Sequence, residues 1–199
     1  MASKKYKYSR YGMYYKINEF LKTIKLLKSG VCLIIGDSLN NKDGKIKNTA
    51  LIDMLPKQGG IFSPSYPEVD IQNMPYSDNM FDYVLSDQVL EHVEKPWIAI
   101  DEVHRVLKVG GLAIFTTCLI HGIHGVPNDY WRFTPNGLRV LFEKFTHIHQ
   151  ADGIGNLRFV IKCLSGQRGI RVLPGTDIEK ETLSNDNINF LNIWIIAEK

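Results

Sequence analysis

The sequence has no long hydrophobic segment. No apolar run approaches the roughly 20 residues needed to cross a lipid bilayer. The first 16 residues, MASKKYKYSRYGMYYK, also lack the apolar stretch of a secretion signal. We therefore expect a cytoplasmic protein without a membrane span.

Cysteine is scarce and irregularly spaced. The 3 cysteines, Cys32, Cys118 and Cys163, stand far apart, which argues against a disulfide framework and against a zinc site built from cysteines. His121 and His124 are close enough in sequence to suggest a metal, but no third ligand stands at a convincing spacing. We predict reduced thiols in or near the core and no metal site.

A large net charge is absent too. The formal charge of +3 is too small to imply a nucleic-acid partner. Residues 1–12 combine Lys and Arg with tyrosines, and we predict a flexible lead-in there rather than a binding arm. With 199 residues, the chain is long enough for one buried core and too short for two ordinary domains. A single domain over residues 1–199 is expected.

The sequence does contain apolar runs that alternate with amphipathic segments. The runs VCLIIG (31–36) and FDYVLS (81–86) are typical of strands buried on both faces. Residues 96–107 place their apolar side chains on one helical face, and Gly110 and Gly111 close that helix before the strand LAIFTT. Strands that alternate with helices predict an α/β fold with a mostly parallel sheet.

Other elements follow from the same periodicities. We predict helices at 13–28, 136–145 and 157–164, strands at 147–151 and 190–198, and another short strand at the start of the segment 68–93. Residues 50–56 form either a second strand or the last turns of a short helix, because periodicity does not separate these two possibilities. The polar stretch 166–189 is expected to be a surface excursion.

The loop after the first strand is where an open parallel sheet binds its ligand. It reads Gly36-Asp37-Ser38, with one glycine where a dinucleotide site has three. Asp37 would also place a carboxylate beside the phosphates of a dinucleotide, whereas it suits a cationic sulfonium. A nicotinamide-dependent oxidoreductase is therefore disfavoured.

Residues 69–135, which include VDIQNMPY, FDYVLSDQVLEHV and RVLKVGGLAIFTT, resemble class I S-adenosylmethionine-dependent methyltransferases of the methyltransferase type 11 kind. The resemblance implies a Rossmann-like, doubly wound α/β fold, with a mostly parallel seven-stranded sheet, helices on both faces and an antiparallel last strand. It also implies S-adenosylmethionine as the cofactor, and methyl transfer to an oxygen or nitrogen of an acceptor.

The resemblance also implies positions for the cofactor. Asp70 would take the adenine amino group and the Ile71 amide would lie beside the ring, while Ser86 and Asp87 would line the methionine end. Asp53 would bind the ribose if its segment is extended. From the residues alone, Asp70 is equally well explained as an aspartate that caps a turn. The predicted cofactor-binding residues are Gly36, Asp37, Ser38, Asp53, Asp70, Ile71, Ser86 and Asp87.

The first motif departs from the family pattern. Family members usually have a second glycine where this chain has Ser38, and the crossover from Gly36 to Ala50 is short and polar. These departures support an alternative function, in which a degenerate methyltransferase fold acts as a non-catalytic binding or scaffold partner.

The segment 121–135, HGIHGVPNDYWRFTP, resembles the H-G-x-P-x-D-Y-W-R-F-T-P loop of one branch of these enzymes. The loop follows the fifth strand, where the acceptor docks in the family, and a small molecule or a saccharide is the expected acceptor. The candidates for accepting a proton from an acceptor hydroxyl are His121, His124 and Asp129. The predicted substrate-binding residues are Tyr130, Trp131 and Arg132.

A structural explanation of the same loop remains open. Trp131 and Phe133 would then anchor the loop in the core, and Asp129 would pair with Arg132 or cap the helix that starts near Asn136. His92, at the start of a helix after the FDYVLS strand, is predicted to be structural rather than catalytic.

Overall fold

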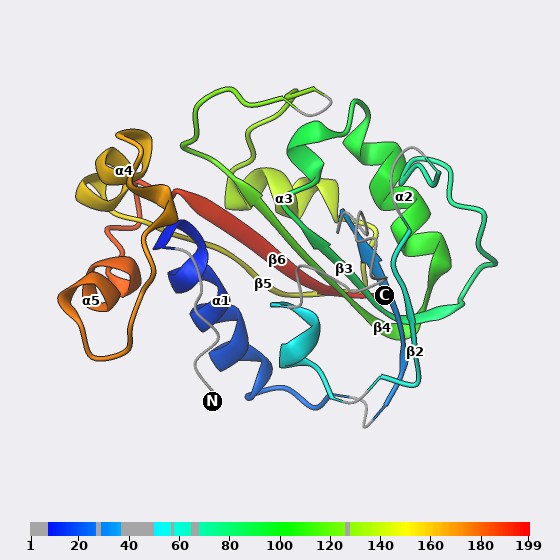
Figure 1. Cartoon of the computed structure of the whole chain (residues 1–199). Coiled ribbons are helices and arrows are strands. Elements are labelled where there is room, and N and C mark those ends of the chain that lie inside the picture. The colour runs from blue at the N-terminus through cyan, green and yellow to red at the C-terminus, as the bar shows by residue number, and fades with distance from the viewer. Residues whose placement is uncertain (1–7, 27–28, 37–49, 57, 65–67, 126–127) are drawn as a thin grey trace.

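The computed structural model describes residues 8–26, 29–36, 50–56, 58–64, 68–125 and 128–199 (Figure 1). These residues form one six-stranded sheet in the order β2-β1-β3-β4-β6-β5. The strands are β1 (Val31–Ile35), β2 (Gly60–Phe62), β3 (Phe81–Asp87), β4 (Leu107–Cys118), β5 (His147–Ile154) and β6 (Asn192–Glu198).

The sheet is mostly parallel. The strands β2, β1, β3 and β4 run in the same direction, whereas β6 lies antiparallel between β4 and β5. The predicted α/β fold with an antiparallel last strand is confirmed. The chain reverses its direction of travel across the sheet at β1, which has β2 on one side and β3 on the other. The boundary between β1 and β3 is therefore the switch point of the sheet.

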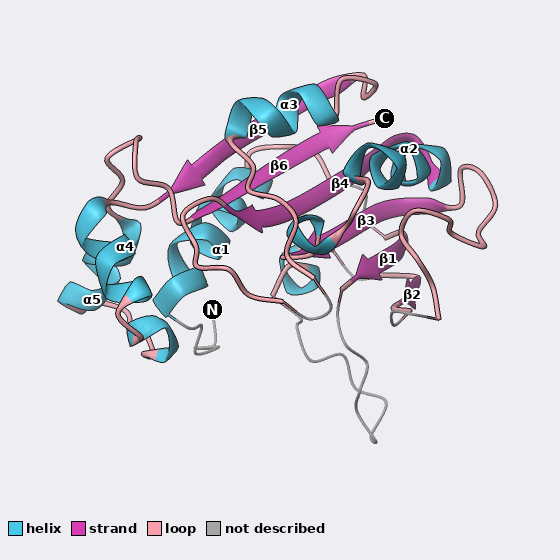
Figure 2. Cartoon of the chain, turned by 90° about the horizontal axis from the view of Figure 1, so that it is seen from above, coloured by secondary structure: helices cyan, strands magenta, loops and turns pink. Residues whose placement is uncertain are grey.

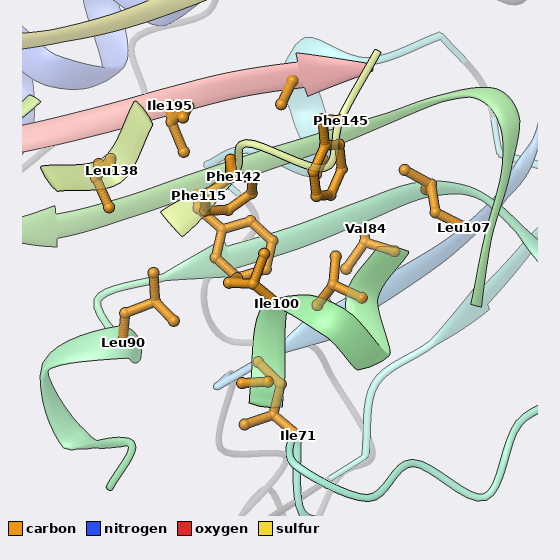
Figure 3. Packing of buried hydrophobic residues seen from close by; sticks show 14 of the residues in the cluster. Ile71, Val84, Leu90, Ile100, Leu107, Phe115, Leu138, Phe142, Phe145 and Ile195 are labelled. Carbon is orange, nitrogen blue, oxygen red and sulfur yellow. The ribbon is translucent and has the colours of Figure 1, made fainter. Parts of the chain in front are cut away.

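Helices cover both faces of the sheet (Figure 2). Helix α1 (Tyr8–Leu21) packs Met13, Ile17 and Leu21 against one face. The opposite face is covered by α2 (Pro96–Val106) and α3 (Pro135–Leu141), whose apolar side chains meet those of β3, β4 and β6 (Figure 3). The remaining helices are α4 (Leu157–Leu164), α5 (Asp177–Leu183) and the short 3-10 turns η1 (Ile52–Met54), η2 (Leu90–His92) and η3 (Gln167–Gly169).

The start of the chain differs from the prediction. Residues 8–12 belong to α1, so the lead-in predicted for residues 1–12 is wrong over this stretch, while residues 1–7 lie outside the described part. Tyr8 is buried, and its ring meets the ring of Phe159 edge-on at 4.8 Å between centroids. Aromatic burial of this kind fixes the first turn of the helix.

One predicted strand is missing among the described residues, which explains the count of six instead of seven. Near residue 70 the backbone makes only an isolated bridge between Asp70 and Asn73. The chain turns there because the Asp70 carboxylate accepts a hydrogen bond from the Gln72 amide, at 2.8 Å. The next residues are tied to α2, since the Met74 amide donates to the Glu102 carboxylate at 2.9 Å.

The segment 50–56 adopts the helical alternative. Its centre is the 3-10 turn η1, and the second strand of the sheet along the chain is β2 instead. Leu51 and Leu55 are both buried against the α1 side of the sheet, and their spacing of four suits a helical turn. Asp53 lies between them, on the exposed side of the turn.

The predicted helix, paired glycines and strand are present, but the glycines lie inside β4. Gly110 and Gly111 fall where the pairing of β3 with β4 shifts register, between Phe81 and Tyr83. Gly110 has a φ of +76°, a backbone conformation that favours glycine. No helix in the described ranges is long and apolar enough to cross a membrane.

Candidate functional site

The candidate residues gather at the edge of the sheet where the parallel strands end. Gly36 follows β1, Ser86 and Asp87 end β3, and the loop of residues 119–134 follows β4. Asp37 and Ser38 lie outside the described residues. The structure therefore brings the ends of β1 and β3 together at the switch point, with the predicted acceptor loop beside them.

Gly36 is required by both conformation and space. Its φ is +84°, and a Cβ atom at this position would lie 2.0 Å from Cγ2 of Val89. Because glycine has no Cβ atom, the backbone at position 36 lies closer to Val89 than it could with any other residue type there.

Asp87 is the centre of a polar cluster that joins three elements. Its carboxylate accepts hydrogen bonds from Arg10 at 3.0 Å and from the Tyr14 hydroxyl at 2.6 Å, both from α1, and from Thr116 of β4. Burial, together with the Asp87 charge, raises the pKa of Tyr14, so the phenol stays protonated and donates. Next to this cluster, Ser86 is fully buried, and its hydroxyl has no hydrogen-bond partner in the described part of the chain.

Asp70 and Ile71 make structural contacts, while their predicted cofactor contacts stay predictions. The Asp70 carboxylate caps its own turn through the backbone and side-chain nitrogens of Gln72, which is the alternative that the sequence left open. Ile71 is buried in the cluster that α2 packs against. Asp53, exposed on η1, does not end a strand, so the condition for its predicted ribose contact is not met.

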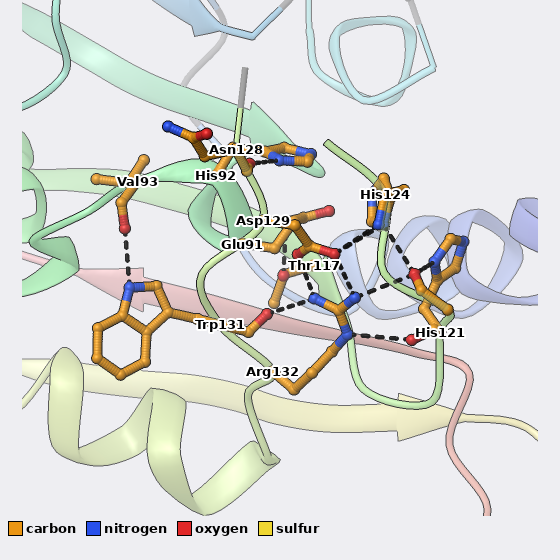
Figure 4. Close-up of polar contacts among 11 residues, drawn as sticks. Glu91, His92, Val93, Thr117, His121, His124, Asn128, Asp129, Trp131 and Arg132 are labelled. Carbon is orange, nitrogen blue, oxygen red and sulfur yellow. Dashed lines mark hydrogen bonds and ion pairs between the residues drawn. The ribbon is translucent and has the colours of Figure 1, made fainter. Parts of the chain in front are cut away.

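Asp129 and Arg132 form a two-pronged ion pair in the loop after β4 (Figure 4). The Asp129 side chain is 2% exposed, and it also accepts a hydrogen bond from the His124 amide at 2.7 Å. Arg132 donates further to the carbonyl oxygens of His121 and Gly122. The hydrogen bonds from Arg132 hold the pKa of Asp129 well below its usual range. Asp129 is therefore a poor proton acceptor, and we remove it from the candidates for a general base.

The aromatic residues of the loop divide into one anchor and two surface groups. Phe133 is buried, whereas Tyr130 and Trp131 remain exposed, Trp131 by 37%. The Trp131 indole donates to the Val93 carbonyl at 2.9 Å, and its ring lies 6.1 Å from the ring of Trp97. The structural explanation of the loop thus holds for Phe133 and for the Asp129–Arg132 pair, while Tyr130 and Trp131 present their rings at the surface.

Three imidazoles line up beside the ion pair. The rings of His121 and His124 are 4.3 Å apart, and those of His92 and His124 are 4.9 Å apart, between centroids. Burial lowers the pKa of His121, which favours the neutral ring at pH 7.

Glu91 is the residue that the sequence analysis missed. Its side chain is fully buried and accepts a hydrogen bond from the Thr117 hydroxyl at 2.7 Å, while its backbone carbonyl accepts from the amides of Tyr130 and Trp131. The potential metal ligands of Glu91, His92 and His124 lie within 4.8 Å of one another. Two of these residues follow β3 and the third follows β4, so spacing along the sequence gave no signal of the group.

Comparison with known proteins agrees with this architecture. Residues 48–115 match the family described as methyltransferase domain. An uncharacterized methyltransferase of Mycolicibacterium gilvum is 30% identical over 101 residues, which are 49% of this chain and 39% of the relative. Another, from Mycolicibacterium vanbaalenii, is 44% identical over 43 residues, 22% of this chain and 17% of the relative. The chain thus spans less than half the length of these curated relatives.

Solved structures share the fold. An S-adenosylmethionine-dependent methyltransferase from Mesorhizobium loti superposes with a TM-score of 0.59 at 11% identity, over 96% of this chain and 100% of that chain. The phosphoethanolamine N-methyltransferase 2 of Haemonchus contortus, solved with S-adenosyl-L-methionine, gives a TM-score of 0.56 at 15% identity, over 93% of this chain and 52% of that chain. The matched segment is similar to the methyltransferase domain family, and the chain shares its fold with solved S-adenosylmethionine-dependent methyltransferases.

Proposed function

We propose that this protein transfers a methyl group from S-adenosylmethionine to an oxygen or nitrogen of an acceptor held by the loop 119–134. The observation that carries the proposal is the position of Gly36, Ser86 and Asp87. They end the two strands that flank the switch point of the sheet, which is where open α/β sheets bind their ligands.

The residues at the switch point fit this cofactor. Val89 fills the space that a side chain at position 36 would need, and the buried Ser86 hydroxyl lacks a partner within the described ranges. Asp87 places a carboxylate at the end of β3, where Arg10 and Tyr14 of α1 fix its orientation. When bound, S-adenosylmethionine supplies a methyl group on a cationic sulfur, already activated for transfer.

The protein then has to position the acceptor. Alignment of the two reactants can supply roughly 7–11 kcal/mol of the barrier without a dedicated acid or base. For a hydroxyl acceptor, a neutral imidazole is suited to take the proton, and His121 is our first candidate because burial lowers its pKa. His124, whose ring contacts that of His121, is the second.

The exposed rings of the loop support an acceptor with a flat or cyclic body. Tyr130 and Trp131 are exposed, and the Trp131 indole is fixed by its hydrogen bond to the Val93 carbonyl. Rigid aromatic faces of this kind pack against the apolar faces of small molecules and sugars. We therefore favour a small molecule or a saccharide as the acceptor.

Calorimetric titration with S-adenosylmethionine and with its demethylated product tests the proposal. We expect both to bind, and we expect Asp87→Asn to weaken binding at least about tenfold, a loss of about 1.4 kcal/mol. The matched control is Asp101→Asn, which changes an exposed carboxylate on α2 and should bind as the wild type does. In a methyl-transfer assay, His121→Ala should lower turnover while cofactor affinity is kept.

If neither compound binds to a folded protein, the transferase proposal is wrong, and the scaffold alternative replaces it. If the control variant weakens binding as much as Asp87→Asn does, the cofactor does not bind at the switch point.

A further inference from the structure

Glu91 and His92 have no role in the proposed methyl transfer, and they form a group with His124, its second candidate for a proton acceptor. Glu91 and His92 lie on η2, directly after β3, and His124 lies in the loop after β4. Each residue offers one ligand atom, and these atoms all lie within 4.8 Å of one another. Two imidazoles and one carboxylate at this separation match the ligand set of a divalent transition-metal ion.

Each of the two imidazoles has its Nδ1 atom beside a backbone carbonyl oxygen. The Nδ1 atom of His92 lies 2.5 Å from the carbonyl oxygen of Asn128 (Figure 4). Because a carbonyl only accepts, Nδ1 carries the proton and Nε2 is left with its lone pair. His124 is held in the same way, with Nδ1 at 3.2 Å from the Gly122 carbonyl and 3.3 Å from Asp129. Metal-binding histidines usually donate their second nitrogen to such carbonyl and carboxylate partners.

The carboxylate supplies an independent observation. Glu91 is fully buried, and one of its oxygens accepts from Thr117, but the other, Oε1, has no hydrogen-bond partner among the described residues. A buried carboxylate oxygen without a partner is costly. A cation beside it would remove that cost.

We propose that Glu91, His92 and His124 bind one divalent transition-metal ion, with Zn²⁺ as the best match to two nitrogen ligands and one oxygen ligand. Three protein ligands leave a fourth position open for water or for an oxygen of the acceptor. The ion would also fasten the loop after β4 to the end of β3. This inference is independent of methyl transfer, because a metal site can form whether or not the cofactor binds.

The full-length protein, stripped with chelator and dialysed, should be titrated with ZnCl2 by calorimetry and with CoCl2 by visible absorption. We expect one tight site, with cobalt absorption typical of nitrogen and oxygen ligands. His92→Ala and His124→Ala should each weaken Zn²⁺ binding by at least roughly tenfold. Zn²⁺ should raise the melting temperature of the wild type and leave that of both variants nearly unchanged.

The matched control is His147→Ala. His147 is exposed on β5, and its ring lies 4.5 Å from that of His149, so this pair is the alternative place for adventitious Zn²⁺. The proposal predicts that His147→Ala keeps the tight site. It is overturned if the wild type binds no metal tightly, or if binding is lost in His147→Ala and kept in His92→Ala. Titration of the metal-free protein with S-adenosylmethionine separates this outcome from a failure of the transferase proposal.

Discussion

Asp129 shows how an aspartate, a residue type common in active sites, can have a structural role. The carboxylate is almost fully buried, both of its oxygens meet the guanidinium of Arg132, and the His124 amide adds a further hydrogen bond. This arrangement fixes the path of the acceptor loop, because Arg132 also holds the carbonyls of His121 and Gly122. The geometry of residues 121–124 therefore depends on this ion pair.

We expect Asp129→Asn to destabilise the fold by about 3–5 kcal/mol, the usual cost of removing one partner of a buried pair. Urea denaturation measures the difference in the free energy of unfolding. The control, Asp177→Asn, removes a carboxylate that is 96% exposed and should change stability by less than about 1 kcal/mol. Equal effects of the two substitutions would contradict a special role for Asp129.

The same pair gives a dependence on pH with a defined sign. The pKa of Asp129 in the folded protein is lowered from its ordinary value of 3.8, first by the hydrogen bonds from Arg132. Its contribution to stability is therefore complete above the unfolded value and is lost as the pH falls toward the folded value. The stability difference between the wild type and Asp129→Asn should shrink below about pH 4. A difference that grows on acidification would be the wrong sign.

At the residue scale, the sequence predicted which side chains gather and left their roles undecided. Asp70 and Asp129 each had a catalytic or binding role and a structural role available, and both adopt structural hydrogen bonds. Such a choice depends on partners that only the folded loop brings within reach. Glu91 was missed because its contacts are with Tyr130 and Trp131, which are distant from it in the sequence.

Gly12, on α1, fixes how closely two helices approach. A Cβ atom at Gly12 would lie 2.1 Å from the carbonyl oxygen of Thr182 on α5, which is backbone and cannot move aside freely. Alanine favours a helix over glycine by roughly 0.5–1 kcal/mol, so intrinsic propensity alone predicts that Gly12→Ala would stabilise the protein. The contact between α1 and α5 predicts the opposite.

We expect Gly12→Ala to destabilise the protein by about 1–3 kcal/mol through this overlap. The control is Gly137→Ala in α3, where the added Cβ would lie 3.4 Å from its nearest neighbour and helix propensity should decide. Thermal melting of both variants gives the comparison. Stabilisation by Gly12→Ala would mean that α1 and α5 do not touch as described.

Elements were predicted best where local and tertiary preferences agree. The helix predicted at 157–164 has the observed bounds of α4, because Asn156 caps its start and Phe159, Val160 and Cys163 face the core. The segment 50–56 is decided by the burial of Leu51 and Leu55 against the sheet. The strand expected near residue 70 fails because Met74 is tied to α2, a contact between distant positions that periodicity does not report.

At the scale of the whole molecule, the three cysteines report on the integrity of the core. Cys32, Cys118 and Cys163 are all buried and free, and burial raises the pKa of each thiol to about 12. Because the thiolate is the reactive form, we expect a disulfide reagent such as DTNB to react very slowly with the native protein. After denaturation in guanidinium, all 3 cysteines should react. Rapid reaction of any thiol in the native state would contradict its burial.

The sequence alone could not predict which residues surround Asp87 and Glu91. Asp87 meets Arg10 and Tyr14, from which it is separated by 77 and 73 positions along the chain. Glu91 on η2 and Thr117 on β4 are joined although they are 26 positions apart in the sequence. The order of strands in the sheet, rather than any local motif, decides which of these residues meet.

The position of β6 has a consequence for how the protein is made. Within the described sheet β5 pairs with β6 alone, and β6 fills the place between β5 and β4. During synthesis, residues 147–154 therefore cannot pair with the sheet until residues 192–198 have emerged from the ribosome. Until then β4 presents an unpaired edge, the kind of surface that recruits other chains. The nascent polypeptide is thus most exposed to misassociation after β4 and β5 have been made and before β6 has been made.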